Sequence, residues 1–303
     1  MSSKLTESEQ GREIWRVNSF TQQAFTGNPA GVVPDAEGLS DQEMQLIAAE
    51  VNDISETVFI LPAQSPGADL RLRFFTSTTE VDLCGHATVA ALFTLAWTGR
   101  IRGNDDTRNI RAETRVGVLS LDLEFAAGKP VWAVMEQLVP EFAPAPGVSQ
   151  AARVLGVSEE QLATDLEIGC CSTGIWVCYV PLVDLQALAA VDIQPQLIET
   201  LWPGRDDFCG VYAFAFRDEA TTQGRFFSLP QYGIFEDPVT GTASGGLGAY
   251  LVDRGRLAQD AELSAQQGVE MGRAGQVRVR RNHNGRMSIR GQAVAVFRGR
   301  LLT

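Results

Sequence analysis

The stretch EVDLCGHATVAAL, residues 80–92, holds both the main fold signal and the main chemical signal of this sequence. It contains one of the two histidines in a chain of 303 residues, two positions after a cysteine. From Gly85 to about Thr98 the pattern predicts a helix, and Gly99 suits the position after a helix end. Cys84-Gly85-His86 is therefore a catalytic dyad, half of a metal site, or the ordinary start of a buried helix.

The overall composition excludes several classes of partner. With 45% hydrophobic and 20% charged residues, the chain can bury the core of one large or two ordinary domains. The net charge of −12 opposes nucleic-acid binding, and no apolar run is long enough to span a membrane. Five scattered cysteines and a polar start without a signal peptide favour a cytoplasmic protein. We expect residues 1–12 to form a disordered tail.

A weak internal repeat indicates that the two halves of the chain are related. Residues 73–101 and 225–257 each contain Arg-Phe-Phe, a polar turn and a helix rich in small residues. Counted from the two arginines, Cys84 and Asp237 take equivalent places at two helix starts. Two such domains would point both positive helix ends at one cleft, which suits a carboxylate ligand.

Strand and helix patterns elsewhere in the chain predict an α/β fold. Ser40 and Glu43 form a capping box ahead of a helix over about 41–52, and Asn284-Gly285 is typical of a hairpin turn. Residues 128–130, Gly-Lys-Pro, are the first candidate domain boundary. Strands are expected at 14–20, 55–61, 70–75, 115–125, 131–138, 174–182 and 210–216, and helices at 149–156 and 158–166.

The number and spacing of histidines and cysteines give little support to a metal site or to hydrolase chemistry. Two histidines are too few for a three-histidine zinc site, and no pair of cysteines has CxxC spacing. We interpret Cys170, Cys171 and Cys178 as core residues, and we expect no metal. A Cys–His hydrolase is disfavoured because the side chains of Cys84 and His86, two positions apart at a strand-to-helix turn, would not normally face each other.

Proton transfer at carbon remains, and Glu56 is the best candidate for it. This glutamate opens an apolar strand, where partial desolvation would raise its pKa towards neutrality. A solvated glutamate at a strand edge fits the local sequence as well. The glycine-rich segment TGTASGGLG (240–248) fits neither dinucleotide nor Walker patterns, so it serves either close approach to a ligand or tight helix packing.

Five motifs, taken together and in order, resemble the phenazine biosynthesis PhzF-like family. That resemblance implies the fold of diaminopimelate epimerase: two pseudo-symmetric α/β domains, each a sheet wrapped round a central helix, with the active site between them. The expected domains are 1–127, completed by a returning strand at 294–303, and 128–293. The motifs are AFTGNPAGVV (24–33), NDISETVFI (52–60), LRFFTSTTEVDLCGHATVAAL (72–92), FEDPVTGTASGGLGAYL (235–251) and QGVEMGR (267–273).

The resemblance also implies a reaction and its residues. Characterised members isomerise a small unsaturated hydroxy amino acid by proton shuttling, without metal or organic cofactor. The family's glutamate base falls on Glu56, and its other proton-relay positions fall on His86 and Asp237. The implied substrate is a small carboxylate-bearing molecule, and members are often homodimers. The positions implied to bind the substrate are Cys84, Gly85, Gly241 and Thr242.

Two alternatives remain open beside the isomerase. Relatives of this fold that are epimerases use two cysteines; the first corresponds to Cys84, whereas the second falls on Asp237. An epimerase would thus have to use Cys84 or Glu56 with Asp237, and a metabolite-binding protein with a degenerate site is the other alternative. Ala87 stands where the phenazine enzyme itself has proline, and Thr242 stands where serine is usual, which favours a substrate different from the phenazine precursor.

Overall fold

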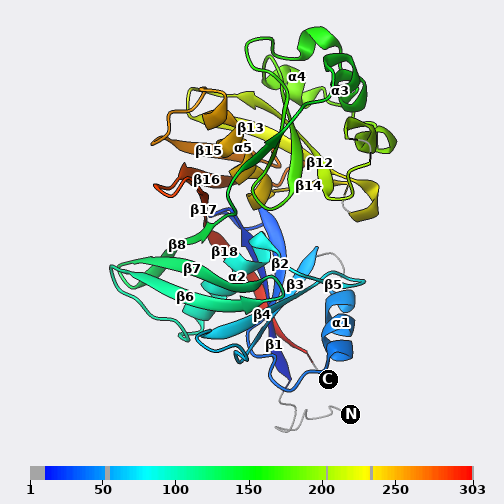
Figure 1. Ribbon diagram of the computed structural model, residues 1–303. Coiled ribbons are helices and arrows are strands. Elements are labelled where there is room, and N and C mark those ends of the chain that lie inside the picture. Colours follow the sequence, from blue (N-terminus) through cyan, green and yellow to red (C-terminus); the bar gives the residue numbers. More distant parts are fainter. Residues whose placement is uncertain (1–10, 52–54, 203, 233–234, 302–303) are drawn as a thin grey trace. The chain divides into compact units, whose positions relative to one another are not determined.

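The computed structural model describes residues 11–51, 55–202, 204–232 and 235–301 (Figure 1). Most of the expected N-terminal tail, residues 1–10, and the first three residues of the NDISETVFI motif lie outside these ranges. The chain divides into two compact units. Of the described residues, those within 11–25, 29–133 and 292–301 form the N-terminal unit, and those within 26–28 and 134–291 form the C-terminal unit.

In the N-terminal unit a sheet surrounds helix α2, whose side chains are almost all buried. Strands β2 and β3 pair in parallel, β3 and β4 antiparallel, β4 and β6 in parallel, and β6 and β7 antiparallel. Helix α2 packs against β1, β3 and β18. The elements are β1 (Arg12–Ser19), β2 (Asn28–Val33), α1 (Asp41–Glu50), β3 (Glu56–Leu61), β4 (Leu70–Phe75), β5 (Glu80–Val81), α2 (Gly85–Trp97), β6 (Thr107–Thr114), β7 (Gly117–Ala126), β8 (Lys129–Glu136) and β18 (Ala293–Leu301).

The C-terminal unit repeats this arrangement round helix α5. Strands β11 and β12 pair in parallel, β12 and β13 antiparallel, β13 and β15 in parallel, and β15 and β16 antiparallel. Helix α5 packs against β10, β11, β16 and β17. The α-helices and strands are β9 (Glu141–Ala143), α3 (Val148–Leu155), β10 (Gly169–Ser172), β11 (Trp176–Pro181), α4 (Leu185–Ala189), β12 (Phe208–Phe216), β13 (Thr221–Ser228), β14 (Glu236–Asp237), α5 (Gly241–Asp253), β15 (Glu262–Gln267), β16 (Gly275–Arg281) and β17 (Met287–Gly291), with short 3-10 turns at Glu159–Gln161, Pro195–Leu201 and Pro230–Tyr232.

Helices α2 and α5 both have 13 residues, and each follows an equivalent antiparallel strand pair, β4–β5 in one unit and β13–β14 in the other. The predicted duplication is therefore confirmed. In the two pairs, Phe75 lies opposite Glu80 and Phe227 opposite Glu236. The connection is residues 76–79 in one unit and 228–235 in the other. Because of these four extra residues, the residue equivalent to Cys84 at the helix start is Thr240. The predicted equivalence of Cys84 and Asp237 is therefore wrong.

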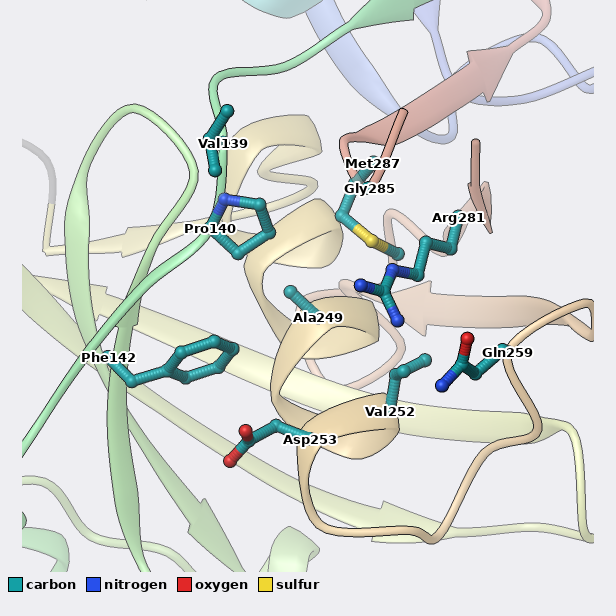
Figure 2. A pocket seen from close by; sticks show the side chains of 10 residues that line it. All are labelled: Val139, Pro140, Phe142, Ala249, Val252, Asp253, Gln259, Arg281, Gly285 and Met287. Atoms are coloured by element: carbon teal, nitrogen blue, oxygen red, sulfur yellow. The ribbon is translucent and has the colours of Figure 1, made fainter. Parts of the chain in front are cut away.

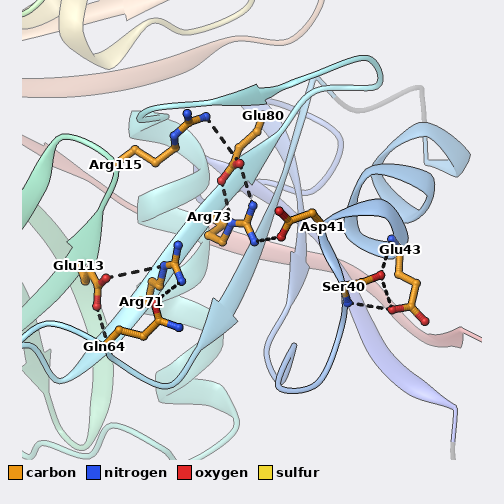
Figure 3. A network of polar contacts seen from close by, with 9 residues as sticks. All are labelled: Ser40, Asp41, Glu43, Gln64, Arg71, Arg73, Glu80, Glu113 and Arg115. Atoms are coloured by element: carbon orange, nitrogen blue, oxygen red, sulfur yellow. Dashed lines mark hydrogen bonds and ion pairs between the residues drawn. The ribbon is translucent and has the colours of Figure 1, made fainter.

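A largely buried arginine joins the first strand of each pair to the second. Arg73 donates two hydrogen bonds to the carboxylate of Glu80 and a third to Asp41 (Figure 3). In the other unit Arg225 bonds Glu236 in the same two-pronged way. Such fork-to-fork pairs fix geometry as well as charge, so each pair fixes the short strand that leads into the central helix.

The glycines inside α5 serve helix packing. A Cβ atom added at Gly246 would lie 2.1 Å from the hydroxyl oxygen of Tyr179, and one added at Gly248 would lie 2.6 Å from a methyl carbon of Val279. Only residues without a side chain allow α5 to approach its surrounding strands this closely. Of the two roles considered for TGTASGGLG, tight packing holds for these glycines.

Local patterns predicted many elements well, with one clear error. The Ser40–Glu43 capping box is present, and the hairpin turns at Gly285 with positive φ. The helix predicted at 158–166 is instead a single 3-10 turn, because Leu162 leaves it to pair with Leu182. Cys170, Cys171 and Cys178 are buried as expected. Within the described ranges, no helix is both long and apolar enough to cross a membrane.

We predict that Arg73→Met destabilises the protein by about 3 kcal/mol, because it leaves the largely buried Glu80 carboxylate without its main partner. Arg115→Met is the matched control, since Arg115 contacts the same carboxylate from a half-exposed position and should cost about 0–1 kcal/mol. Urea unfolding of the two variants measures both values. Equal losses would show that Arg73 has no special structural role.

Candidate active site

Three of the predicted site residues form one cluster in the N-terminal unit. Glu56 opens β3, Cys84 immediately precedes α2, and His86 lies in the first turn of that helix. His86 Nε2 lies 3.2 Å from Glu56 Oε2, and the sulfur of Cys84 lies 3.4 Å from Nδ1 and 3.8 Å from Nε2 of His86. A carboxylate, a thiol and an imidazole therefore share one small volume.

The contact between Cys84 and His86 overturns one prediction. We expected that side chains two positions apart at this turn would not face each other. Cys84 has an extended backbone, with φ −141° and ψ 115°, and the helix starts at the next residue. This change of backbone conformation brings both side chains to the same side of the turn.

The cluster is held by short hydrogen bonds to its backbone. Ser19 donates its hydroxyl hydrogen to the carbonyl of His86 at 2.6 Å, and Thr88 donates to the carbonyl of Cys84 at 2.8 Å. Ser55 places its hydroxyl 3.2 Å from His86 Nε2. Glu56 Oε2 is buried, and among the described residues it accepts no well-aligned hydrogen bond, although His86 is at ion-pair distance.

The electrostatics of the cluster correct the expectation for Glu56. Burial raises the pKa of its carboxyl, but the charge and hydrogen bonds of His86, with smaller contributions from Ser55 and Cys84, outweigh burial and lower the pKa below 4.5. A raised pKa was therefore the wrong prediction, because the sequence did not show that a cation would face this glutamate. Glu56 is a carboxylate at neutral pH.

His86 and Cys84 shift in the complementary sense. Burial lowers the pKa of His86, but the interactions of the ring with Cys84 and with the Glu56 carboxylate raise it, with a net direction well above 6.5. Burial and the charge of Glu56 raise the pKa of the Cys84 thiol, so that residue is neutral at pH 7. Glu56 is therefore the charge that keeps His86 protonated, and the pair is a carboxylate facing an imidazolium.

Asp237 is the centre of a second polar cluster, in the C-terminal unit. Asn28 donates from Nδ2 to the Asp237 carboxylate at 2.8 Å, and the Thr240 hydroxyl donates to the other carboxylate oxygen. Gln267 donates to the backbone carbonyl of Asp237 at 2.7 Å and to the Thr240 hydroxyl at 3.2 Å. These bonds fix the direction in which the carboxylate points.

Asn28, Thr240 and Gln267 were not predicted from the sequence as residues of the site. Asn28 lies in the AFTGNPAGVV motif and Gln267 in the QGVEMGR motif. Both motifs contributed to the family resemblance, but no residue of either was predicted to belong to the site. Asn28 belongs to the C-terminal unit, although the residues on both sides of segment 26–28 belong to the other unit. The sequence signal that could have identified Asn28 is a polar asparagine at the start of the otherwise apolar run NPAGVV, and the structure shows that this side chain is buried.

The remaining predicted residues lie at the two helix starts. Gly85 opens α2, and Gly241 with Thr242 opens α5. Neither Cys84 nor Thr240 caps its helix through the side chain, so the first N–H groups keep their capacity to bind an anion. A Cβ added at Gly85 would meet no described atom within 4 Å, so there is space beside that helix start.

The C-terminal unit also has a pocket that lies apart from the predicted site residues. Figure 2 shows it beside the last turns of α5, where Phe142, Val252 and Arg281 are among the lining side chains. Its volume is about 410 Å³. None of the predicted site residues lines it, so it is no part of the candidate active site.

Comparison with known proteins places the chain among isomerases. A protein of Bacillus subtilis (strain 168) named uncharacterized isomerase YfhB is 35% identical over 291 residues, covering 90% of this chain and 92% of that protein. The trans-2,3-dihydro-3-hydroxyanthranilate isomerase of Pseudomonas chlororaphis is 29% identical over 257 residues, covering 85% and 86% of the two chains. The chain is an isomerase that acts on a small molecule.

The family follows from the sequence and the fold together. The family model described as phenazine biosynthesis-like protein (PhzC-PhzF) matches residues 17–299, and the chain belongs to this family. The crystal structure of a PhzF-family protein from Bacillus anthracis superposes with a TM-score of 0.85 at 31% identity, covering 97% of this chain and 100% of that chain. A hydroxyproline epimerase from Agrobacterium vitis, with a TM-score of 0.65 and 14% identity over 98% of this chain and 94% of its own, shares the fold.

We predict that Glu56→Gln lowers the pKa of His86. Removing the negative charge leaves burial as the main effect on the imidazole, and burial favours the neutral form. At pH 7 the wild-type ring should be an imidazolium and the variant ring largely neutral. NMR titration of the histidine ring signals measures this, with exposed His283 as the internal reference. An unchanged His86 titration would show that Glu56 does not hold the imidazolium.

Proposed function

We propose that this protein is a cofactor-independent isomerase that moves a proton between two carbons of a small carboxylate-bearing metabolite. The observation that supports this most is the Glu56 carboxylate: it is buried, ionised, and has one oxygen with no well-aligned hydrogen bond among the described residues. An acceptor in that state is available to take a proton from a bound substrate.

In the proposed reaction Glu56 takes a proton from an activated carbon and returns it to another carbon of the same molecule. His86, as an imidazolium, hydrogen-bonds a polar group of the substrate and stabilises negative charge that develops as the proton leaves. When the substrate draws the His86 proton towards itself, Glu56 loses part of the partner that lowers its pKa, and it becomes the stronger base.

Asp237 and the helix starts complete the proposal. The Asp237 carboxylate, oriented by Asn28 and Thr240, would hydrogen-bond the substrate and assist the proton relay. Gly85, Gly241 and Thr242 would bind the substrate carboxylate or a neighbouring oxygen through backbone N–H groups and a hydroxyl. That both clusters serve one substrate is the prediction taken from the family resemblance.

The proposed substrate is an unsaturated hydroxy amino acid or a close analogue. The Pseudomonas chlororaphis relative is named for such a compound, trans-2,3-dihydro-3-hydroxyanthranilate. Ala87 stands where the phenazine enzyme itself has proline, and Thr242 stands where serine is usual, so we propose a substrate of different shape. We further propose a cytoplasmic homodimer, and the five free cysteines are consistent with a reducing compartment.

The epimerase alternative has one observation in its favour, the contact of the Cys84 sulfur with His86. Two observations weigh against a two-thiol mechanism. The Cys84 thiol is neutral at pH 7, and the equivalent helix start in the other unit carries Thr240, which has no thiol. Proton transfer by Glu56 is therefore the better supported chemistry.

We predict that Glu56→Gln lowers turnover by at least about 100-fold, the lower figure for losing a general acid–base group. Binding should change much less, because the amide has the same shape and can still form hydrogen bonds. The measurement is exchange of substrate hydrogen with D₂O, alongside ligand affinity by calorimetry. Cys84→Ala is the matched comparison and should cost far less. If Cys84→Ala lost all exchange while Glu56→Gln kept the wild-type exchange rate, the base would be Cys84 and not Glu56.

We also predict that the activity survives prolonged treatment with EDTA, because the proposed steps use only protein side chains. Exchange of substrate hydrogen before and after chelation tests this. Loss of activity that one particular metal restores would contradict the cofactor-independent mechanism.

A further inference from the structure

Glu56, Cys84 and His86 present three donor atoms that match a soft divalent metal ion. The carboxylate oxygen, the sulfur and a ring nitrogen all lie within 4.8 Å of one another. The sequence has neither three histidines nor paired cysteines, so it did not predict this combination, in which three different residue types meet only through the fold.

The spacing of these atoms is close to that of a tetrahedral zinc site. With metal–ligand distances of about 2.0–2.3 Å, two ligand atoms of such a site lie roughly 3.3–3.8 Å apart. From His86 Nε2, the carboxylate oxygen of Glu56 lies at 3.2 Å and the sulfur of Cys84 at 3.8 Å. The three ligand atoms all lie within 4.8 Å of one another, so small movements of the side chains would bring them onto one ion.

The cluster is also organised for such binding before any ion arrives. The backbone carbonyls of Cys84 and His86 are fixed by hydrogen bonds from Thr88 and Ser19. Glu56 Oε2 has no hydrogen bond to give up among the described residues, and burial limits competition from water. Thiolate, imidazole and carboxylate are the ligands that zinc prefers, whereas Mg²⁺ and Ca²⁺ require oxygen ligands.

We propose that Glu56, Cys84 and His86 form an inhibitory Zn²⁺ site. The ion would bind one carboxylate oxygen, the Cys84 thiolate and Nε2 of the neutral imidazole, with water in the fourth position. Binding releases the thiol proton and the second imidazolium proton to solvent. The inhibition rests on the proposed function, because the bound ion would occupy the lone pair of the proton acceptor and the ring nitrogen that assists it. The binding itself does not depend on any substrate.

Cobalt binding tests the site without any enzyme assay. Co²⁺ added to chelator-treated protein should produce one equivalent of a thiolate-to-cobalt charge-transfer absorption, and one equivalent of Zn²⁺ should remove it. Cys84→Ser should lose the absorption, and Cys209→Ser, the change at the one cysteine that is not buried, should keep it. Absence of the absorption from the wild type, or its persistence in Cys84→Ser, would overturn the site.

A second variant keeps the metal site testable if Cys84→Ser misfolds. Glu56→Gln keeps the shape and the thiol, so the absorption should remain while zinc affinity falls by more than the roughly 10- to 100-fold typical of losing an outer-shell partner. Competition with a chromophoric chelator measures this affinity. An unchanged affinity would exclude Glu56 as a ligand and overturn the three-residue site.

The inhibition is tested separately, by D₂O exchange into substrate. Micromolar Zn²⁺ should abolish exchange, EDTA should restore it, and Mg²⁺ should have no effect. Exchange that continues while zinc is bound would overturn the inhibition. A protein that binds zinc through Cys84 but shows no exchange with any substrate would contradict the proposed isomerase reaction and leave the metal site supported.

Discussion

The buried pair of Glu56 and His86 is the interaction on which the proposed chemistry of this protein depends. A charge alone in such a place would be strongly destabilised, and each member of the pair offsets the cost of burying the other. The pair also decides protonation: it keeps the glutamate ionised and the histidine charged, although burial by itself favours the neutral form of both. It forms only if the start of β3 lies against the start of α2.

The two units show how one scaffold supports two different chemical environments. Each unit has a strand pair locked by an arginine–glutamate fork, followed directly by a buried 13-residue helix. At the helix start the N-terminal unit carries Cys84 and His86, and the C-terminal unit carries Thr240 and Thr242. The backbone arrangement is the same in both units, so the difference in chemical environment comes from a few side chains at the start of the central helix.

The environment of Asp237 differs from that of Glu56 in kind. Its two carboxylate oxygens accept hydrogen bonds from an amide and a hydroxyl, which are neutral donors, whereas Glu56 faces a cation. A carboxylate held by several donors is fixed in direction, and a connected network of this kind is stronger than its separate bonds. A glutamate oxygen without a well-aligned hydrogen bond suits proton transfer, and an aspartate with one bond to each carboxylate oxygen is held in a fixed direction towards a ligand.

The sequence by itself determined those features that depend on neighbours along the chain. The Ser40–Glu43 cap, the turn at Gly285 and helix α2 could all be predicted, because capping, positive φ and apolar periodicity are local properties. The ordered motifs also identified the family and the candidate residues Glu56, His86 and Asp237. Only the tertiary structure showed that Thr240 matches Cys84, that Cys84 touches His86, and that Asn28 holds Asp237 across 209 positions of sequence. Loop length, side-chain direction and long-range packing decide those contacts, and they also set the pKa of Glu56, since a pKa depends on the charges that the fold brings near.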